Sequence, residues 1–223
     1  TGEKKYLDQA KFFVDQRGNS QGHRLYGFSS YDHLPVTQQT EAVGHAVRAA
    51  YMYSAMADVA ALTGDEAYQQ ALNKLWEDVV FRKMYLTGGI GSTGAWEGFG
   101  PAYNLPNASA YCETCASIAN AFWNYRMFLL EGEAKYLDVF ERVVYNGVLS
   151  GISLSGDRFF YANPLASFGQ HERTPWFGCA CCPPNVARFL PQMGQYAYAT
   201  SGDRLFVNLY GANSAQLEVN SLK

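Results

Sequence analysis

A short pattern occurs three times along the chain: a glycine, an acidic residue directly after it, and a tyrosine four positions after the glycine. The copies begin at Gly2, Gly64 and Gly132. In the second and third copies, apolar residues at helical spacing run up to the glycine, which readily adopts the left-handed conformation that ends a helix. The acidic residue that follows is a favoured helix cap. These two copies therefore predict the turns of two helical hairpins, 68 positions apart.

The apolar spacing predicts helices on both sides of each turn. The expected helices cover residues 40–63 and 66–80 in the first hairpin, 110–130 and 134–149 in the second, and 184–200 in a further helix. Helical hairpins that repeat at this interval and are separated by long loops are typical of an α/α toroid, in which inner and outer helices alternate. We therefore expect a mainly α fold that forms about half of an (α/α)6 barrel, with the functional residues in loops at one end.

The pattern changes near the C-terminus. After Gly202, residues 204–210 have the composition of a strand, and residues 215–220 alternate between polar and apolar positions. Residues 157–162, within a long loop, are a further strand candidate.

These patterns predict two domains. The partial (α/α)6 barrel is expected at residues 1–200, and the beginning of a β-sandwich domain at residues 201–223. Because the first copy of the glycine pattern lies at the start of the sequence, the helix that should precede it is absent. We therefore expect a fragment that lacks the N-terminal part of the barrel and most of the β-domain. A half barrel has an open apolar flank, which a homo-oligomer would cover.

The charge of the chain argues against two classes of partner. The net charge is −3, and no cluster of lysines and arginines could neutralise a phosphate backbone or an anionic membrane. No apolar run approaches the roughly 20 residues needed to cross a bilayer, and the charged residues 1–5 do not resemble a signal peptide. We therefore expect a soluble, cytoplasmic protein that binds neither nucleic acid nor membranes.

The five cysteines are the clearest chemical signal, because three of them fall within residues 179–182. Their odd number and their spacing do not suit a disulfide framework, so we expect reduced thiols that hold a metal. The pairs Cys112/Cys115 and Cys179/Cys182 would suit a structural zinc site with four cysteine ligands. However, 63 residues separate the two pairs, which is far more than in compact zinc modules. A structural and a catalytic role for the metal both remain open at this point.

Two further residues stand out less clearly. Glu97 lies in a loop, residues 86–100, that contains six glycines and could approach a ligand closely. A loop glutamate is usually just solvated, so its position alone is weak evidence. His45 lies in an expected helix, where a histidine more often packs in the core than contacts a ligand.

Several segments together resemble glycoside hydrolase family 127, the β-L-arabinofuranosidases. The matching segments are His33–Val36, Gln39–His45, Ala57–Asp65, Leu86–Gly91, Glu113–Cys115, Arg142–Gly151 and Trp176–Asn185. The similarity extends over residues 22–210, and the combination of Glu-Thr-Cys with Cys-Ala-Cys-Cys-Pro-Pro-Asn is highly specific.

The resemblance implies a retaining glycoside hydrolase that releases β-L-arabinofuranose from an oligosaccharide or a glycoprotein glycan. It implies one Zn²⁺ ion, with Cys181 as the nucleophile and Glu97 as the general acid/base. It also implies that His45 and Tyr161 contact the sugar. The implied zinc ligands are Glu113, Cys115, Cys181 and Cys182.

Two alternatives to this function remain. One is a zinc metallohydrolase in which the metal activates water, which requires an open coordination position. The other is a helical scaffold that binds partners through its loops and has a structural four-cysteine zinc site. If the chain is a glycosidase fragment, it is expected to have little activity in isolation, because part of the substrate pocket would be missing.

Overall fold

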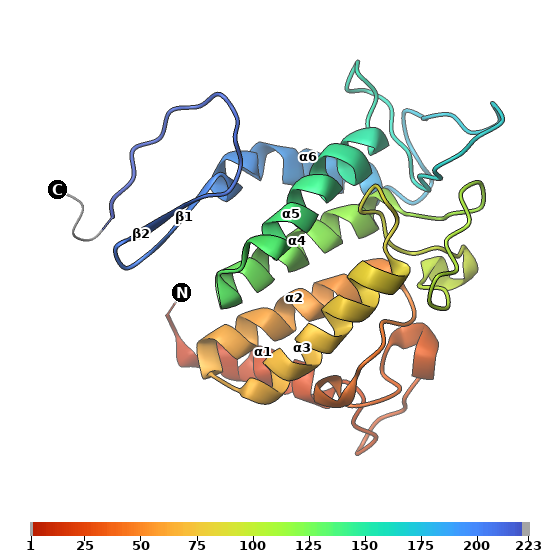
Figure 1. Cartoon of the computed structure of the whole chain (residues 1–223). Helices are drawn as coiled ribbons and strands as arrows, with labels where there is room; N and C mark the ends of the chain where they lie inside the picture. The colour runs from red at the N-terminus through yellow and green to blue at the C-terminus, as the bar shows by residue number, and fades with distance from the viewer. Residues whose placement is uncertain (1, 220–223) are drawn as a thin grey trace.

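The computed structural model describes residues 2–219, and six α-helices dominate this part of the chain. They are α1 (Lys4–Gln16), α2 (Ala46–Thr63), α3 (Glu66–Asp78), α4 (Thr114–Glu131), α5 (Ala134–Arg142) and α6 (Cys182–Phe189). Helices α2 and α3 form one hairpin, and α4 and α5 form the next (Figure 1). None of the helices in residues 2–219 is long and apolar enough to cross a bilayer.

The two predicted hairpin turns are confirmed. Gly64 and Gly132 end α2 and α4 in the left-handed conformation, with φ of 69° and 73°. Their N–H groups donate to the carbonyls of residues four positions earlier, which satisfies helix ends that would otherwise lack partners. In the first turn, the side chain of Asp65 accepts a hydrogen bond from Ala67 N and so caps α3. The predicted cap is wrong in the second turn, where the side chain of Glu133 makes no capping hydrogen bond to α5.

Inner and outer helices alternate as the repeat predicts. The inner helices α2 and α4 are buried around most of their circumference, whereas α3 and α5 bury one face. Helix α4 packs between α2 and α6, while α1 and α3 pack on α2 and α5 packs on α4. The described residues therefore form half of an (α/α)6 barrel, and the long loops gather at the end where α2, α4 and α6 begin (Figure 1).

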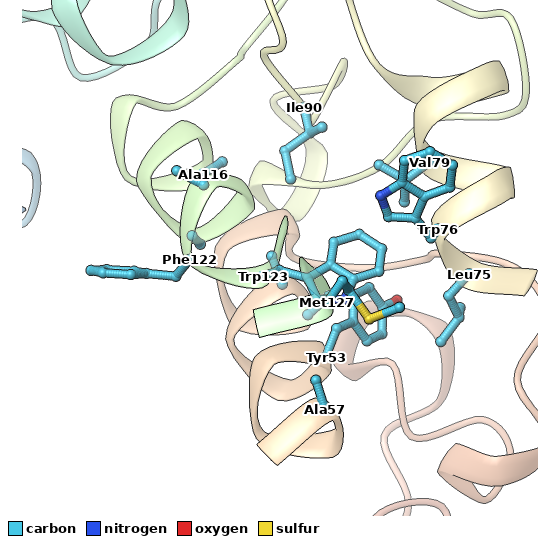
Figure 2. Close-up of a cluster of buried hydrophobic side chains, with 14 of the residues drawn as sticks. Tyr53, Ala57, Leu75, Trp76, Val79, Ile90, Ala116, Phe122, Trp123 and Met127 are labelled. Atoms are coloured by element: carbon cyan, nitrogen blue, oxygen red, sulfur yellow. The ribbon is translucent and has the colours of Figure 1, made fainter. Parts of the chain in front are cut away.

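Large aromatic side chains fill the contact between the inner helices. Tyr53 of α2 and Trp123 of α4 are fully buried, with ring centroids 4.8 Å apart, and Met127 lies beside them (Figure 2). Between α3 and α4, buried Trp76 donates from Nε1 to Asn124 Oδ1 over 2.8 Å. The Asn124 amide in turn donates to Asn120 Oδ1 over 2.8 Å. This polar network inside an apolar core ties the two hairpins together.

Replacing Asn124 by leucine is expected to lower the free energy of unfolding by about 1–3 kcal/mol, because the buried Trp76 N–H loses its only acceptor in the described residues. Urea unfolding followed by tryptophan fluorescence measures the change. Asn146→Leu is the matched control: Asn146 is exposed, and among the described residues its side chain bonds only to the carbonyl of Arg142, so we expect a change of about 0.5 kcal/mol or less. Equal destabilisation of the two variants would contradict the prediction.

Both outer helices end in a π-helical turn, which the apolar spacing did not predict. Helix α3 continues into Val79–Lys83, and α5 continues into Val143–Val148. The last predicted helix, residues 184–200, was too long: α6 ends at Phe189 and a 3-10 segment, Leu190–Tyr196, follows. Pro191 lies at the start of that segment and cannot donate the backbone hydrogen bond that an α-helix would require.

The predicted strands are only partly confirmed. A hairpin forms from β1 (Tyr198–Ser201) and antiparallel β2 (Arg204–Val207), so four of the expected residues 204–210 are in a strand. Residues 157–162 do not form a strand, although Phe159 makes isolated bridges to Ile152 and Thr174. Residues 215–219 have no strand either, and Asn220 lies outside the described residues.

The expected boundary between residues 200 and 201 falls inside the β1–β2 hairpin. Phe206 of β2 packs edge-on against Phe128 of α4, with ring centroids 5.5 Å apart. The hairpin therefore lies on the helical part, and the division into two domains stays a prediction.

Candidate functional site

Three residues that begin the inner helices lie at equivalent positions of the repeat. His45, Glu113 and Cys181 are the N-cap residues of α2, α4 and α6, and each is 68 positions after the previous one. The spacing equals that of the two hairpin turns. Since the inner helices are neighbours and point the same way, the three N-caps meet at the loop-bearing end of the fold (Figure 1). Helix N-termini carry partial positive charge, so this end favours anionic side chains.

Around Glu113 and Cys181, four possible metal ligands form one cluster. One ligand atom each from Glu113, Cys115, Cys181 and Cys182 lies within 4.8 Å of all the others. The sulfurs of Cys115 and Cys181 are 2.9 Å apart, and Cys181 Sγ donates to Glu113 Oε1 over 3.2 Å. Cys182 Sγ is 3.6 Å from the same oxygen. The structure therefore brings together all four residues that the sequence suggested as zinc ligands.

The donors of this cluster suit a bound cation. Glu113 is 1% exposed, and its Oε2 has no hydrogen-bond partner in the described residues. Burial raises the pKa of Glu113, with the charge of Glu97 adding to the increase, and burial also raises the pKa of Cys181. A divalent cation would stabilise the ionised forms of these groups. Three thiols and one carboxylate at these separations match the ligands and the four-coordinate sites that zinc prefers.

The other two cysteines lie outside the cluster, so the two Cys-x-x-Cys pairs do not form a four-cysteine site. Cys112 is buried in a separate small core with Tyr85 and Ala110. Burial raises the pKa of Cys112 to about 12, which keeps it a neutral thiol. Cys179 is exposed, and its sulfur lies 4.0 Å from the hydroxyl of Tyr161.

Glu97 lies beside the metal-ligand cluster with both carboxylate oxygens bonded. His45 Nε2 is 3.0 Å from Oε2, and the hydroxyl of Tyr111 donates to Oε1 over 2.9 Å. Ligand atoms of His45, Glu97 and Glu113 all lie within 4.8 Å of one another. Burial, followed by the charge of Arg48, lowers the pKa of His45, so the imidazole is neutral and donates one N–H to the carboxylate.

The backbone around Glu97 adopts an uncommon conformation. Trp96 and Glu97 have φ of 54° and 52°, in the left-handed region that non-glycine residues seldom occupy. A Cβ at Gly98 would lie 2.7 Å from the carbonyl oxygen of Gly44, so only glycine allows the two backbones to approach. Strained backbone of this kind is concentrated at functional sites.

Tyr161, the second predicted sugar contact, reaches the site from the loop before α6. Its carbonyl accepts from Thr114 N over 3.0 Å, which places it against the first turn of α4. Burial raises the pKa of Tyr161, and the charges of Glu113 and Cys181 raise it further. The ring of Tyr161 packs edge-on against that of Tyr111, with centroids 6.4 Å apart. Both tyrosines therefore line the region between Glu97 and the cysteines.

Tyr111 is a site residue that was not predicted from the sequence. Its only sequence signal is that it directly precedes the Cys112-x-x-Cys115 pair, and that signal also suits a core tyrosine. Its hydrogen bond to Glu97 joins segments 14 positions apart, which no local pattern predicts.

Comparisons with known proteins agree over nearly the whole chain. Residues 1–195 match the family described as Beta-L-arabinofuranosidase, GH127 catalytic domain. The non-reducing end beta-L-arabinofuranosidase of Bifidobacterium longum subsp. longum is 35% identical over 247 aligned positions, which cover 97% of this chain and 38% of that protein.

Two solved structures are similar in fold as well as in sequence. A GH127 β-arabinofuranosidase has a TM-score of 0.95 and 59% identity, with 99% of this chain and 34% of that one covered. A GH127 β-L-arabinofuranosidase from Geobacillus stearothermophilus T6 has a TM-score of 0.88 and 45% identity, with 94% and 37% covered. The chain therefore spans well under half the length of these relatives.

Proposed function

The chain belongs to glycoside hydrolase family 127, and we propose that it carries the catalytic centre of a retaining hydrolase that releases L-arabinofuranose from β-L-arabinofuranosides. The observation that carries the proposal is the position of Cys181. Its thiol lies in a cluster of four side chains that could bind a metal, and Glu97, held by His45 and Tyr111, lies next to that cluster. A nucleophile and an acid/base at one site are what a retaining glycosidase requires.

Glu113, Cys115, Cys181 and Cys182 are the residues that would hold the zinc ion. When bound, zinc would keep the thiol of Cys181 in the thiolate form, which is the nucleophilic form. Cys181 forms and breaks the bond to the sugar, and Glu97 transfers the protons.

In the first half-reaction, the Cys181 sulfur attacks the anomeric carbon and forms a C–S bond. The bond from that carbon to the leaving oxygen breaks, and Glu97 gives its proton to this oxygen. In the second half-reaction, the Glu97 carboxylate takes a proton from water. The water oxygen then bonds to the anomeric carbon, and the C–S bond breaks to return the thiolate. Two inversions leave the anomeric configuration unchanged.

His45 and Tyr161 are the proposed sugar contacts. Nε2 of His45 is 3.0 Å from Glu97 Oε2, and Tyr161 lies near enough to Glu113, Cys181 and Glu97 for their charges to raise its pKa, which burial raises most. The substrate is then the L-arabinofuranosyl end of an oligosaccharide or a glycoprotein glycan. A polar ring nitrogen and a phenol hydroxyl are suitable partners for its hydroxyl groups.

Zinc content separates this function from a scaffold with a structural site. We expect Cys115→Ala and Glu113→Ala to lose bound zinc, because each removes one ligand from a four-ligand cluster. Cys112→Ala and Cys179→Ala are the matched controls and should retain it, since both cysteines lie outside the cluster. Metal analysis of the purified variants by mass spectrometry gives the result. Loss of zinc in the two control variants would favour the scaffold instead.

A further inference from the structure

We propose that Asp78 and Lys83 are positioning residues for acid catalysis. They hold the backbone of Ala42 in place. Ala42 in turn positions the segment that ends at His45, the residue that contacts Glu97. The inference rests on the proposed function, because it assigns Glu97 the role of proton donor. Neither residue contacts the metal-ligand cluster, and neither was singled out by the sequence.

Asp78 and Lys83 form a buried ion pair where α3 passes into its π-helical turn. Their side chains are 5% and 3% exposed, with Lys83 Nζ 3.3 Å from Asp78 Oδ2. Lys83 Nζ also donates to the carbonyl of Ala42 over 2.7 Å and to Glu41 Oε1 over 2.8 Å. Asp78 Oδ2 accepts from the Ala42 N–H over 2.9 Å. The pair therefore holds Ala42 by both its N–H and its C=O.

Ala42 lies three positions before His45, the residue that contacts the proposed acid Glu97. A Cβ at Gly98 would lie 2.7 Å from the Gly44 carbonyl oxygen, so these two backbones are in direct contact. The next residue, His45, forms an antiparallel bridge with Gly98. Its Nε2 lies 3.0 Å from Glu97 Oε2. A shift of the segment at Ala42 would therefore move both the imidazole and the backbone that support the carboxylate.

Lys83 and its neighbour Arg82 both lie in the π-helical turn but differ in burial. Lys83 points inward, where its three N–H donors meet three acceptors. Arg82 is 56% exposed and lies 3.8 Å from Asp78 Oδ1, the other carboxylate oxygen. Buried ion pairs seldom add net stability, because desolvation offsets their attraction. A role in placing Ala42 accounts for a buried lysine here, and π-helical turns are frequent at functional sites.

The test compares Lys83→Met with Arg82→Met in the full-length protein. Methionine keeps the unbranched, apolar part of the lysine and removes the hydrogen bond to the Ala42 carbonyl. Each variant is assayed on two β-L-arabinofuranosides: a disaccharide, whose leaving group needs a proton, and a dinitrophenyl glycoside, whose leaving group does not. Misplacing a catalytic group by about 1 Å can cost about 100-fold in rate.

We expect Lys83→Met to lower kcat on the disaccharide by about 100-fold and on the dinitrophenyl glycoside by less than about 5-fold. Arg82→Met should leave both rates unchanged, because Arg82 is exposed and lies 3.8 Å from Asp78 Oδ1, whereas the Ala42 N–H donates to Oδ2. Hydrogen exchange should become faster in residues 41–45 and 97–99 of Lys83→Met alone. An equal loss on both substrates, or no loss on either, overturns the proposal.

If the Lys83→Met variant does not fold, two further measurements test the proposal. In the double variant Asp78→Asn/Lys83→Met no buried charge is left unpaired. The amide oxygen introduced at position 78 can still accept from the Ala42 N–H, so the same selective loss is expected. In the unaltered protein, the Ala42 amide should exchange only on unfolding of the core. Exchange at the rate of an exposed loop overturns the proposal without any variant. Absence of hydrolysis by the unaltered protein would instead contradict the proposed function and leave the exchange result independent.

Discussion

Replacing Cys181 by alanine is expected to lower kcat/KM on a β-L-arabinofuranoside by about 10⁵-fold, or about 7 kcal/mol of transition-state stabilisation. The alanine side chain has no lone pair with which to attack the anomeric carbon, so no covalent intermediate can form. Steady-state kinetics on an aryl β-L-arabinofuranoside in the full-length protein measures the loss. The intermediate itself should be visible in the unaltered protein, as one anhydropentose attached to the peptide that contains Cys181 after acid quench and digestion.

Two variants show whether the effect comes from the nucleophile or from the metal site. Cys179→Ala, at an exposed cysteine two positions away and outside the cluster, should change kcat/KM by about 3-fold or less. Cys181→Ser keeps a polar ligand atom of similar size, and we expect it to be inactive even where it retains zinc. A Cys181→Ser variant with zinc and full activity would rule out covalent catalysis. It would favour the metallohydrolase alternative, in which water attacks directly.

Glu97→Gln is expected to lower kcat by about 10³- to 10⁴-fold on a disaccharide and by about 10-fold on a dinitrophenyl glycoside. The amide has nearly the same shape as the carboxyl group but carries no acidic proton. A poor leaving group therefore departs slowly, whereas a good one departs without help. With the dinitrophenyl substrate the second half-reaction becomes limiting, because the variant lacks the base that activates water. The glycosylated Cys181 peptide should then accumulate to nearly one per protein.

Glu172→Gln, in the loop before the cysteines and outside the metal-ligand cluster, is the control and should leave both rates unchanged. Burst kinetics with the dinitrophenyl substrate and mass spectrometry of the quenched protein give the two readouts. A Glu97→Gln variant that loses the same factor on both substrates would assign Glu97 to a role other than proton transfer.

Much of the helical architecture could be predicted from local pattern. The left-handed turns at Gly64 and Gly132 depend on residues within one helical turn of the glycine, and the apolar spacing on either side identifies each helix. Local pattern did not predict the short strands correctly. Residues 157–162 make only isolated bridges, through Phe159, and residues 215–219 alternate polar and apolar side chains but pair with no strand among the described residues, so neither stretch forms a strand. The end of α6 was decided by Pro191 rather than by apolar spacing.

The residues of the candidate site, too, could be predicted only in part from the sequence. Residue type and spacing marked the cysteines as metal ligands, and the resemblance added Glu113 and selected four side chains, which the structure brings within 4.8 Å. Spacing alone did not separate Cys112 from Cys115, or Cys179 from Cys182. Cys115 and Cys182 lie in the first turns of α4 and α6, where the helix N-termini meet, whereas Cys112 lies in a separate core and Cys179 is exposed.

By itself, therefore, the sequence determined the helical hairpins, their 68-residue repeat and the residue types able to bind a metal, because each of these depends on neighbours along the chain. Only the tertiary structure decided that the N-caps His45, Glu113 and Cys181 meet, that Tyr111 bonds to Glu97, and that Lys83 holds Ala42. These contacts join segments from 14 to 68 positions apart. They form when packing of the inner helices brings their loops to one end and excludes water from the groups that lie there.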